Sequence, residues 1–265
     1  TGDNQLLGGN GAATIVGGGG LSLLASGSGN SLIYSGTGSD EIFGGTNGHD
    51  TIVAGAGQDF VISQGDELVY GGTVQSVIYG AQSGGDTISG GTAGNVIVSG
   101  AGAETMYAGT GNDTIYGGQS TSAMFTSNVG QTLIVGGSAP LNVVTGAGQA
   151  ILYGSTGNDT VYAGSGSVLM VEGGGQDQVV FGSGNASIFA GTGTDLFTVA
   201  HGKAGGTDTI VDFKVGKDTV LLSGYGNAGV AQTQATGGST VVSLTDGTQL
   251  VFSGVKSLAA NSIIG

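Results

Sequence analysis

The chain has 265 residues, with 60 glycines, one proline, no cysteine and a formal net charge of −14. Abundant glycine without a Gly-X-Y period and almost without proline excludes a collagen helix, and the recurring Ile, Val, Leu and Tyr exclude a flexible glycine-rich linker. The absence of cysteine excludes disulfide bonds, and no apolar run reaches the ~18 residues of a membrane-spanning helix, so we expect no transmembrane segment.

Acidic charge is concentrated in the first three quarters of the chain. Residues 1–202 contain 14 of the 18 acids and no lysine or arginine, and all four lysines lie within residues 203–265. Nucleic acids bind to basic patches, so we expect no nucleic-acid partner. Because uncompensated like charges also repel one another in a compact chain, the pattern indicates either a solvated polyanion or a fold that includes bound cations.

From Gly8 to Thr198 the chain divides into 21 glycine-rich repeats, mostly nine residues long. Each has a turn with glycines, which adopt positive φ at little cost, followed by about three β-prone residues. Such short strands are stable only when they stack on neighbouring coils, so the repeats predict an all-β solenoid with two parallel sheets. The next-to-last residue of every repeat is apolar and is expected in a thin core: Ile15, Leu24, Ile33, Ile42, Ile52, Val61, Val69, Ile78, Ile88, Ile97, Met106, Ile115, Met124, Ile134, Val143, Leu152, Val161, Met170, Val179, Ile188 and Phe197.

The predicted organisation is an N-terminal edge (1–7), the solenoid (8–199) and a β-rich C-terminal cap (200–265). The least regular segment, residues 119–131, is expected to loop out of the solenoid.

Acids recur at the sixth position of many repeats. If two repeats form one coil, acids about 18 residues apart lie on adjacent coils, where their carboxylates repel unless a cation is shared. Oxygen ligands in flexible turns suit a hard cation. Asp66 and Glu67 compete for one position, and the register favours Glu67. The expected ligands are Asp40, Asp50, Asp59, Glu67, Asp86, Glu104, Asp113, Asp159, Asp177, Asp195 and Asp208.

Several repeats match the pattern G-G-x-G-x-D-x-U-x, in which U is a large aliphatic residue. The matches include "SGTGSDEIF" (35–43), "AGTGNDTIY" (108–116) and "AGTGTDLFT" (190–198). This resembles the RTX (repeats-in-toxin) family of secreted bacterial proteins. The resemblance implies a right-handed parallel β-roll with several calcium ions in its turns. Eleven repeats lack an acid at the sixth position, so calcium is not expected at every turn.

The C-terminal part resembles the segment that closes the β-roll of serralysin-type proteases. Asp208, Ile210, Asp212, Phe213 and Gly216 follow its pattern, which continues through Asp218, Val220, Leu222 and Ser223. Residues 246–265 resemble an uncleaved type I secretion signal, and the polar N-terminal residues lack the pattern of a cleavable signal peptide. The resemblance therefore implies a secreted, extracellular or cell-surface protein.

Aromatic residues favour the last position of the repeats. Seven of the eight tyrosines lie there, and Tyr79, Tyr116 and Tyr153 recur every fourth repeat with aliphatic residues between them. Neighbours of inward residues point outward in a strand, so one sheet should carry a row of aromatic and aliphatic side chains. This row is either ordinary strand composition or a surface for self-association or for an extracellular polymer.

No catalytic motif stands out, since His49 and His201 are far apart and no His-Glu-x-x-His motif is present. We therefore expect a non-enzymatic chain. Two functions remain open: a structural, adhesive or surface-assembly protein, and a calcium-dependent export and stability module of a secreted enzyme such as a protease, lipase or polysaccharide-modifying enzyme. Ice binding is disfavoured because Thr and Asn form no continuous array.

Overall fold

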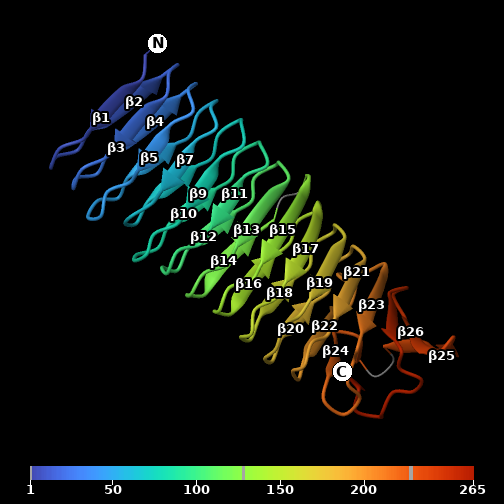
Figure 1. The fold of residues 1–265 in the computed structure, drawn as a ribbon. Helices are drawn as coiled ribbons and strands as arrows, with labels where there is room; N and C mark the ends of the chain where they lie inside the picture. Colours follow the sequence, from blue (N-terminus) through green and yellow to red (C-terminus); the bar gives the residue numbers. More distant parts are fainter. Residues whose placement is uncertain (1, 127–128, 227–228) are drawn as a thin grey trace. The chain divides into compact units, whose positions relative to one another are not determined.

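The computed structural model describes residues 2–126, 129–226 and 229–265. These residues form short strands joined by turns, and the described ranges contain no α-helix. The chain divides into two compact halves, Thr1–Ala139 and Pro140–Gly265. Both halves are parallel β-solenoids, so the predicted all-β solenoid is confirmed (Figure 1).

In the N-terminal half, strands alternate between two parallel sheets, as expected when two repeats make one coil. The odd-numbered sheet contains β1 (Asn4–Leu7), β3 (Ser22–Ala25), β5 (Glu41–Phe43), β7 (Phe60–Ile62), β9 (Val77–Tyr79), β11 (Val96–Val98), β13 (Asp113–Tyr116) and β15 (Gln131–Val135). The even-numbered sheet contains β2 (Thr14–Gly18), β4 (Leu32–Gly36), β6 (Thr51–Val53), β8 (Leu68–Tyr70), β10 (Thr87–Ser89), β12 (Thr105–Tyr107) and β14 (Ser122–Phe125).

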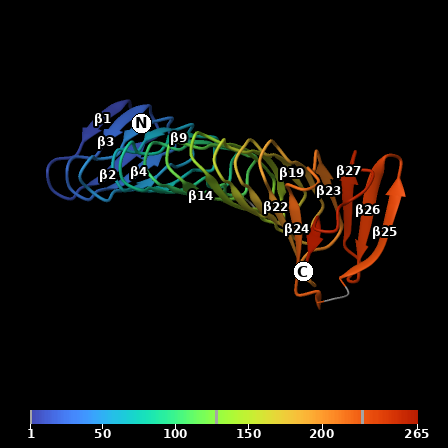
Figure 2. The same cartoon turned by 90° about the horizontal axis from the view of Figure 1, so that it is seen from below.

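The C-terminal half continues this alternation and then changes to antiparallel pairing. One sheet has β17 (Gln149–Tyr153), β19 (Val168–Val171), β21 (Ala186–Phe189), β23 (Thr207–Val211), β27 (Gln249–Ser253), β26 (Ser239–Leu244) and β25 (Val230–Thr236) in spatial order. The other has β16 (Leu141–Val144), β18 (Thr160–Tyr162), β20 (Gln178–Val180), β22 (Leu196–Ala200), β24 (Thr219–Ser223) and β28 (Ile263–Ile264). β26 pairs antiparallel with both β25 and β27 and lies between them (Figure 2).

The core consists of the residues that the repeat register selects. All 21 next-to-last residues are buried, with exposed fractions between 0% and 6%. Along the odd-numbered sheet, Ile42 pairs with Val61 and Val61 with Ile78, so identical positions stack coil upon coil. This prediction is confirmed, and burial of one aliphatic side chain per repeat provides the main apolar stabilisation.

Glycine is required where turns of adjacent coils approach each other. A Cβ atom on Gly57 would lie 1.6 Å from the carbonyl oxygen of Gly38, and one on Gly193 would lie 1.8 Å from that of Gly175. Gly175 itself has φ of 117°, which L-residues with side chains rarely adopt. The glycine content therefore follows from the close stacking of the turns.

The structure bears on two predictions about the organisation of the chain. Residues 119–131 do not simply loop out, because Ser122–Phe125 forms β14 and pairs with β12, although residues 127 and 128 lie outside the described ranges. The packing of Met124 into the core holds this glycine-poor repeat in register. The boundary between residues 199 and 200 stays a prediction. Parallel coil pairing extends beyond it through β23 and β24.

Candidate metal centre

The eleven predicted acids all point into the solenoid. Each is buried, with an exposed fraction of 3% or less. The cause is strand alternation: the acid lies two residues before the buried apolar residue, so both side chains are on the inner side of the strand. Asp40 and Ile42 illustrate this arrangement at β5.

The nine aspartates share one hydrogen-bonding pattern. The Oδ1 atom of each accepts the backbone N–H of the equivalent residue on the preceding coil. The N–H of Asp40 donates to Asp59 at 2.9 Å, and the N–H of Asp159 donates to Asp177 at 2.7 Å. The other acceptors are Asp40, Asp50, Asp86, Asp113, Asp159, Asp195 and Asp208. The two glutamates instead accept N–H groups from their own turns, Gly65 for Glu67 and Gly100 for Glu104.

The coil register brings most of these acids together in columns. The structure stacks Asp50, Glu67, Asp86 and Glu104 before successive strands of the even-numbered sheet, and Asp159, Asp177 and Asp195 before β18, β20 and β22. Asp40 and Asp59 are adjacent, and Asn95 precedes Asp113. Asp208 has no acidic neighbour in its column, since Ala186 precedes it and Leu250 follows it.

The hydrogen bonding of the second carboxylate oxygen, Oδ2, indicates whether these aspartates could bind a cation. Some accept an N–H from their own turn, such as Asp86 Oδ2 from Ala81 at 2.7 Å and Asp159 Oδ2 from Ser155 at 2.7 Å. Others are buried without any hydrogen-bond partner: the Oδ2 atoms of Asp40, Asp113, Asp195 and Asp208. An unpaired buried carboxylate oxygen is destabilising, and a hard cation with oxygen ligands would satisfy it. The donor set therefore fits calcium.

Burial raises the pKa of several of these acids. The pKa of Asp113 rises to about 6 through burial. Burial followed by the charges of Asp159 and Asp195 raises the pKa of Asp177 to about 7. Burial alone accounts for a pKa of about 7 at Asp208. In the absence of a nearby cation, the burial of these carboxyl groups disfavours their ionised form.

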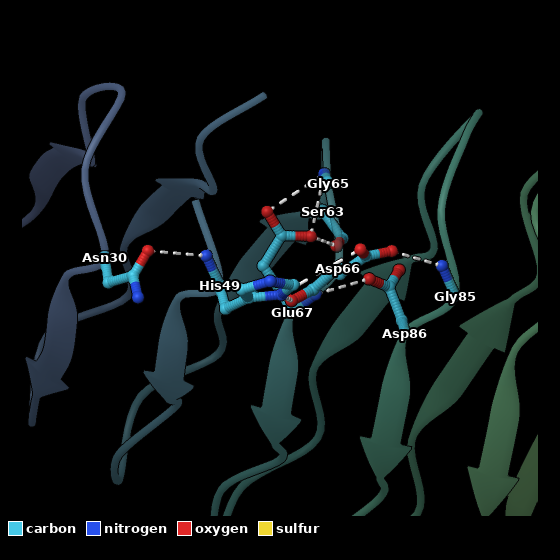
Figure 3. A network of polar contacts seen from close by, with 8 residues as sticks. All are labelled: Asn30, His49, Ser63, Gly65, Asp66, Glu67, Gly85 and Asp86. Atoms are coloured by element: carbon cyan, nitrogen blue, oxygen red, sulfur yellow. Dashed lines mark hydrogen bonds and ion pairs between the residues drawn. The ribbon is translucent and has the colours of Figure 1, made fainter. Parts of the chain in front are cut away.

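Glu67 and Asp66 are adjacent in the chain, but their carboxylates contact different residues (Figure 3). Glu67 is buried; it accepts hydrogen bonds from the Ser63 hydroxyl and the Gly65 N–H, and its own N–H donates to Asp86 at 2.9 Å. Asp66 is exposed, and its Oδ1 accepts the N–H of Gly85 at 2.6 Å. His49 lies beside Asp66 on the surface, with Nδ1 3.9 Å from Asp66 Oδ2. The inward position favoured by the register is therefore that of Glu67.

Two buried acids were missed by the sequence analysis. Asp218 is 1% exposed and accepts the N–H groups of Asp195 at 3.2 Å and Lys214 at 2.6 Å, so it extends the Asp159 column. The sequence analysis did not find Asp218 because it lies 23 residues after Asp195, outside the spacing of about 18 residues. Glu172 is 4% exposed and starts a repeat, at a position where other repeats have Gly, Ala, Ser or Thr, apart from Phe181. A glutamate at the first position of a repeat is the feature of the sequence that could have indicated this buried acid.

Replacing Asp177 by Ala should weaken calcium binding more than replacing Asp113 by Ala, by roughly tenfold, or about 1.4 kcal/mol. Asp177 has an acidic neighbour on each side, Asp159 and Asp195, whereas Asp113 lies between Asn95 and Thr132. Loss of the Asp177 carboxylate therefore affects two positions between coils, one shared with Asp159 and one shared with Asp195. Calcium titrations of both variants and the parent measure the difference, and equal losses would contradict shared ligation by Asp177.

Comparison with known families identifies the repeats. The RTX calcium-binding nonapeptide repeat (four copies) matches residues 16–47, 44–75, 80–115, 98–120 and 144–167. These ranges contain the turns of eight of the predicted acids and confirm that the chain carries calcium-binding repeats. A search of curated proteins gave no match. Among the described residues there is no helix long and apolar enough to cross a membrane.

Proposed function

We propose that this chain, which is an RTX calcium-binding β-roll protein, is a secreted structural or adhesive protein that folds outside the bacterial cell when it binds calcium. Calcium supplies the positive charge and the oxygen coordination that the buried acid columns need. Calcium-binding β-rolls of this kind are typical of secreted bacterial proteins, which supports the extracellular location that we propose.

Coupling of folding to calcium is supported by the burial of the acids. The carboxylates of the Asp50 and Asp159 columns are stacked inside the solenoid, and residues 1–202 contain no lysine or arginine to neutralise them. Since the ligands come from different coils, the complete site exists only in the folded chain, and the binding free energy becomes folding free energy. A chain exported unfolded would then fold where calcium is plentiful.

The structural or adhesive role is carried by one observation, an exposed apolar face on the odd-numbered sheet of the N-terminal half. We define this apolar face by two outward rows, of which the first is Glu41, Phe60, Val77, Val96, Thr114 and Leu133, and the second is Phe43, Ile62, Tyr79, Val98, Tyr116 and Val135. Glu41 is its single charged residue. The matching rows of the even-numbered sheet are interrupted by the hydroxyl groups of Thr51, Thr87, Thr105 and Ser89.

We propose that copies of the chain associate with one another through this apolar face. Phe60, Tyr79 and Tyr116 are 38–41% exposed, and the rings of Phe60 and Tyr79 lie 5.4 Å apart. Contiguous exposed apolar surface of this kind is typical of interaction sites. The near absence of charge also means that two copies can approach here in spite of the net charge of −14.

Replacement by Ser of Tyr79 and Tyr116 in the apolar face, together with Tyr153 at the end of β17 in the C-terminal half, should abolish calcium-dependent self-association while leaving calcium binding nearly unchanged. These side chains point outward, and their buried neighbours Ile78 and Ile115 are retained. The matched control is the replacement of Tyr70, Tyr107 and Tyr162 by Ser. These three tyrosines are equally exposed (43–48%, against 40–48%) but lie on the other sheet of each half.

Sedimentation velocity with and without calcium measures the effect. Loss of assembly in the first variant but not in the control supports the proposed face. Equal assembly of both variants and the parent contradicts it. A parent that binds calcium but stays monomeric at high concentration would also contradict it, and a soluble extracellular polymer would then be tested as the partner.

The alternative function is a calcium-dependent export and stability module of a secreted enzyme. The observation in its favour is the segment that resembles the closing part of serralysin-type proteases, which forms β23 and β24 at the end of the parallel coils. A catalytic domain encoded in the same gene would support this alternative. We assign no catalytic residue to the chain.

A further inference from the structure

Glu172 lies at the first position of its repeat, whereas the predicted ligands from Asp40 to Asp195 lie at or next to the sixth position. It follows β19 directly, and its N–H donates to the carbonyl of Phe189 at 3.0 Å. The turn Gly173–Gln176 separates it from Asp177. Its side chain is buried, yet neither Oε1 nor Oε2 has a hydrogen-bond partner. A carboxylate in this condition needs a ligand or a proton.

The unpaired carboxylate faces two others. One oxygen each from Glu172, Asp177 and Asp195 lie within 4.8 Å of one another. Oxygens that share one calcium ion can be separated by up to about 5 Å, because Ca–O distances are about 2.3–2.6 Å. Asp195 Oδ2 is likewise buried and unpaired. Three carboxylates therefore converge, and two of them have free oxygens.

The carboxylates are also held in place. Asp177 Oδ1 accepts the N–H of Asp159 at 2.7 Å, and Asp195 Oδ1 accepts the N–H of Asp177 at 3.2 Å. These hydrogen bonds fix both aspartates by the backbone of adjacent coils, so binding a cation would need little rearrangement.

The surrounding charges leave the cluster strongly negative. Asp159 and Asp218 also lie close enough to act on Glu172 electrostatically. The nearby cation is Lys214, which acts on Asp195, but its ammonium group donates to the carbonyls of Ala190 and Gly191. Lys214 thus lies at the next turn and donates its hydrogen bonds to backbone carbonyls instead of to Glu172.

We propose that Glu172, Asp177 and Asp195 form one buried three-carboxylate calcium site, in which Glu172 is a ligand that the other repeat turns do not supply. It rests on the proposed calcium-dependent function and deepens it. Its distinguishing ligand comes from the first position of a repeat, where a glycine, alanine, serine or threonine is usual, and it lies outside the ranges matched by the RTX repeat. Three carboxylates favour a hard divalent cation over a softer one.

The test is the number of calcium ions bound per chain, measured by equilibrium dialysis with radioactive calcium. Glu172→Gln keeps the shape of the side chain and removes its charge, and Glu172→Ala restores the residue found at the equivalent Ala54, Ala108 and Ala190. Asp3→Asn, at the exposed N-terminal edge, is the control for loss of one negative charge. We expect both Glu172 variants to lose one bound ion, or to bind one ion roughly tenfold more weakly, relative to the parent and to Asp3→Asn, with the β signal in saturating calcium retained.

Two other outcomes have separate meanings. Equal stoichiometry and affinity in the parent and both Glu172 variants overturn Glu172 as a calcium ligand, while calcium binding by the parent would leave the proposed function intact. A parent that binds no calcium overturns the proposed function itself, and with it this site.

Discussion

Removal of calcium with EDTA will abolish most of the far-UV β signal at neutral pH, and millimolar calcium will restore it. The physical reason is the stacking of buried carboxylates such as Asp159, Asp177 and Asp195, whose mutual repulsion is not relieved by any lysine or arginine in residues 1–202. Circular dichroism and thermal melting measure the change. The apolar core provides about one large side chain per repeat, and native stability is a small difference between large opposing terms, so we expect the repulsion to unfold the chain when the cation is removed.

Magnesium provides the control for ionic specificity. It requires a smaller, near-octahedral arrangement and gives up its water reluctantly, so the same concentration of magnesium should restore little of the signal. If the spectrum and the melting curve were insensitive to EDTA, the acid columns would be stable without metal and calcium-dependent folding would be wrong.

Lowering the pH in EDTA, from 9 to 5.5, will restore part of the β signal that calcium removal abolishes. Burial raises the pKa of Asp208, Asp177 and Glu67 to about 7 and that of Asp113 to about 6. Burial, followed by the charges of Asp195, Asp177, Asp218 and Asp159, raises the pKa of Glu172 to about 9. Protons therefore replace part of the missing cation charge.

The sign follows from linkage between protonation and folding. The folded-state pKa values lie above the unfolded values near 4, so the folded chain binds more protons and its stability falls as the pH rises. The stabilisation is complete below about pH 4 and is lost as the pH passes through the folded values of about 6 to 9. For Asp208 alone, the shift from 3.8 to about 7 corresponds to about 4 kcal/mol.

The control for this experiment is the same pH series in saturating calcium. Calcium competes with protons for the same carboxylates, so its affinity should increase with pH and the folded signal should stay nearly constant. Melting temperatures in EDTA that rise from pH 5.5 to pH 9 would contradict the assignment of raised pKa values to these buried acids.

Much of this protein was determined by its sequence, because the repeat is short and local. A glycine turn, an inward acid and an inward aliphatic residue recur together, and strand alternation alone places Asp40 and Ile42 on the same side of β5. Because two repeats make one coil, residues about 18 positions apart occupy equivalent positions on adjacent coils and stack on each other. The burial of all eleven predicted acids and all 21 core residues follows from that period.

The tertiary structure alone decided what departs from the period. Asp218 joins the Asp159 column across 23 residues because the segment from Ala200 to Lys214 lengthens that coil, and Lys214 returns to the carbonyls of Ala190 and Gly191. Glu172 meets Asp195 only because adjacent coils stack, and no local pattern shows that its two oxygens lack partners. Periodic features are encoded within each repeat, whereas these contacts depend on which side chains the stacked coils bring within a few ångströms of one another.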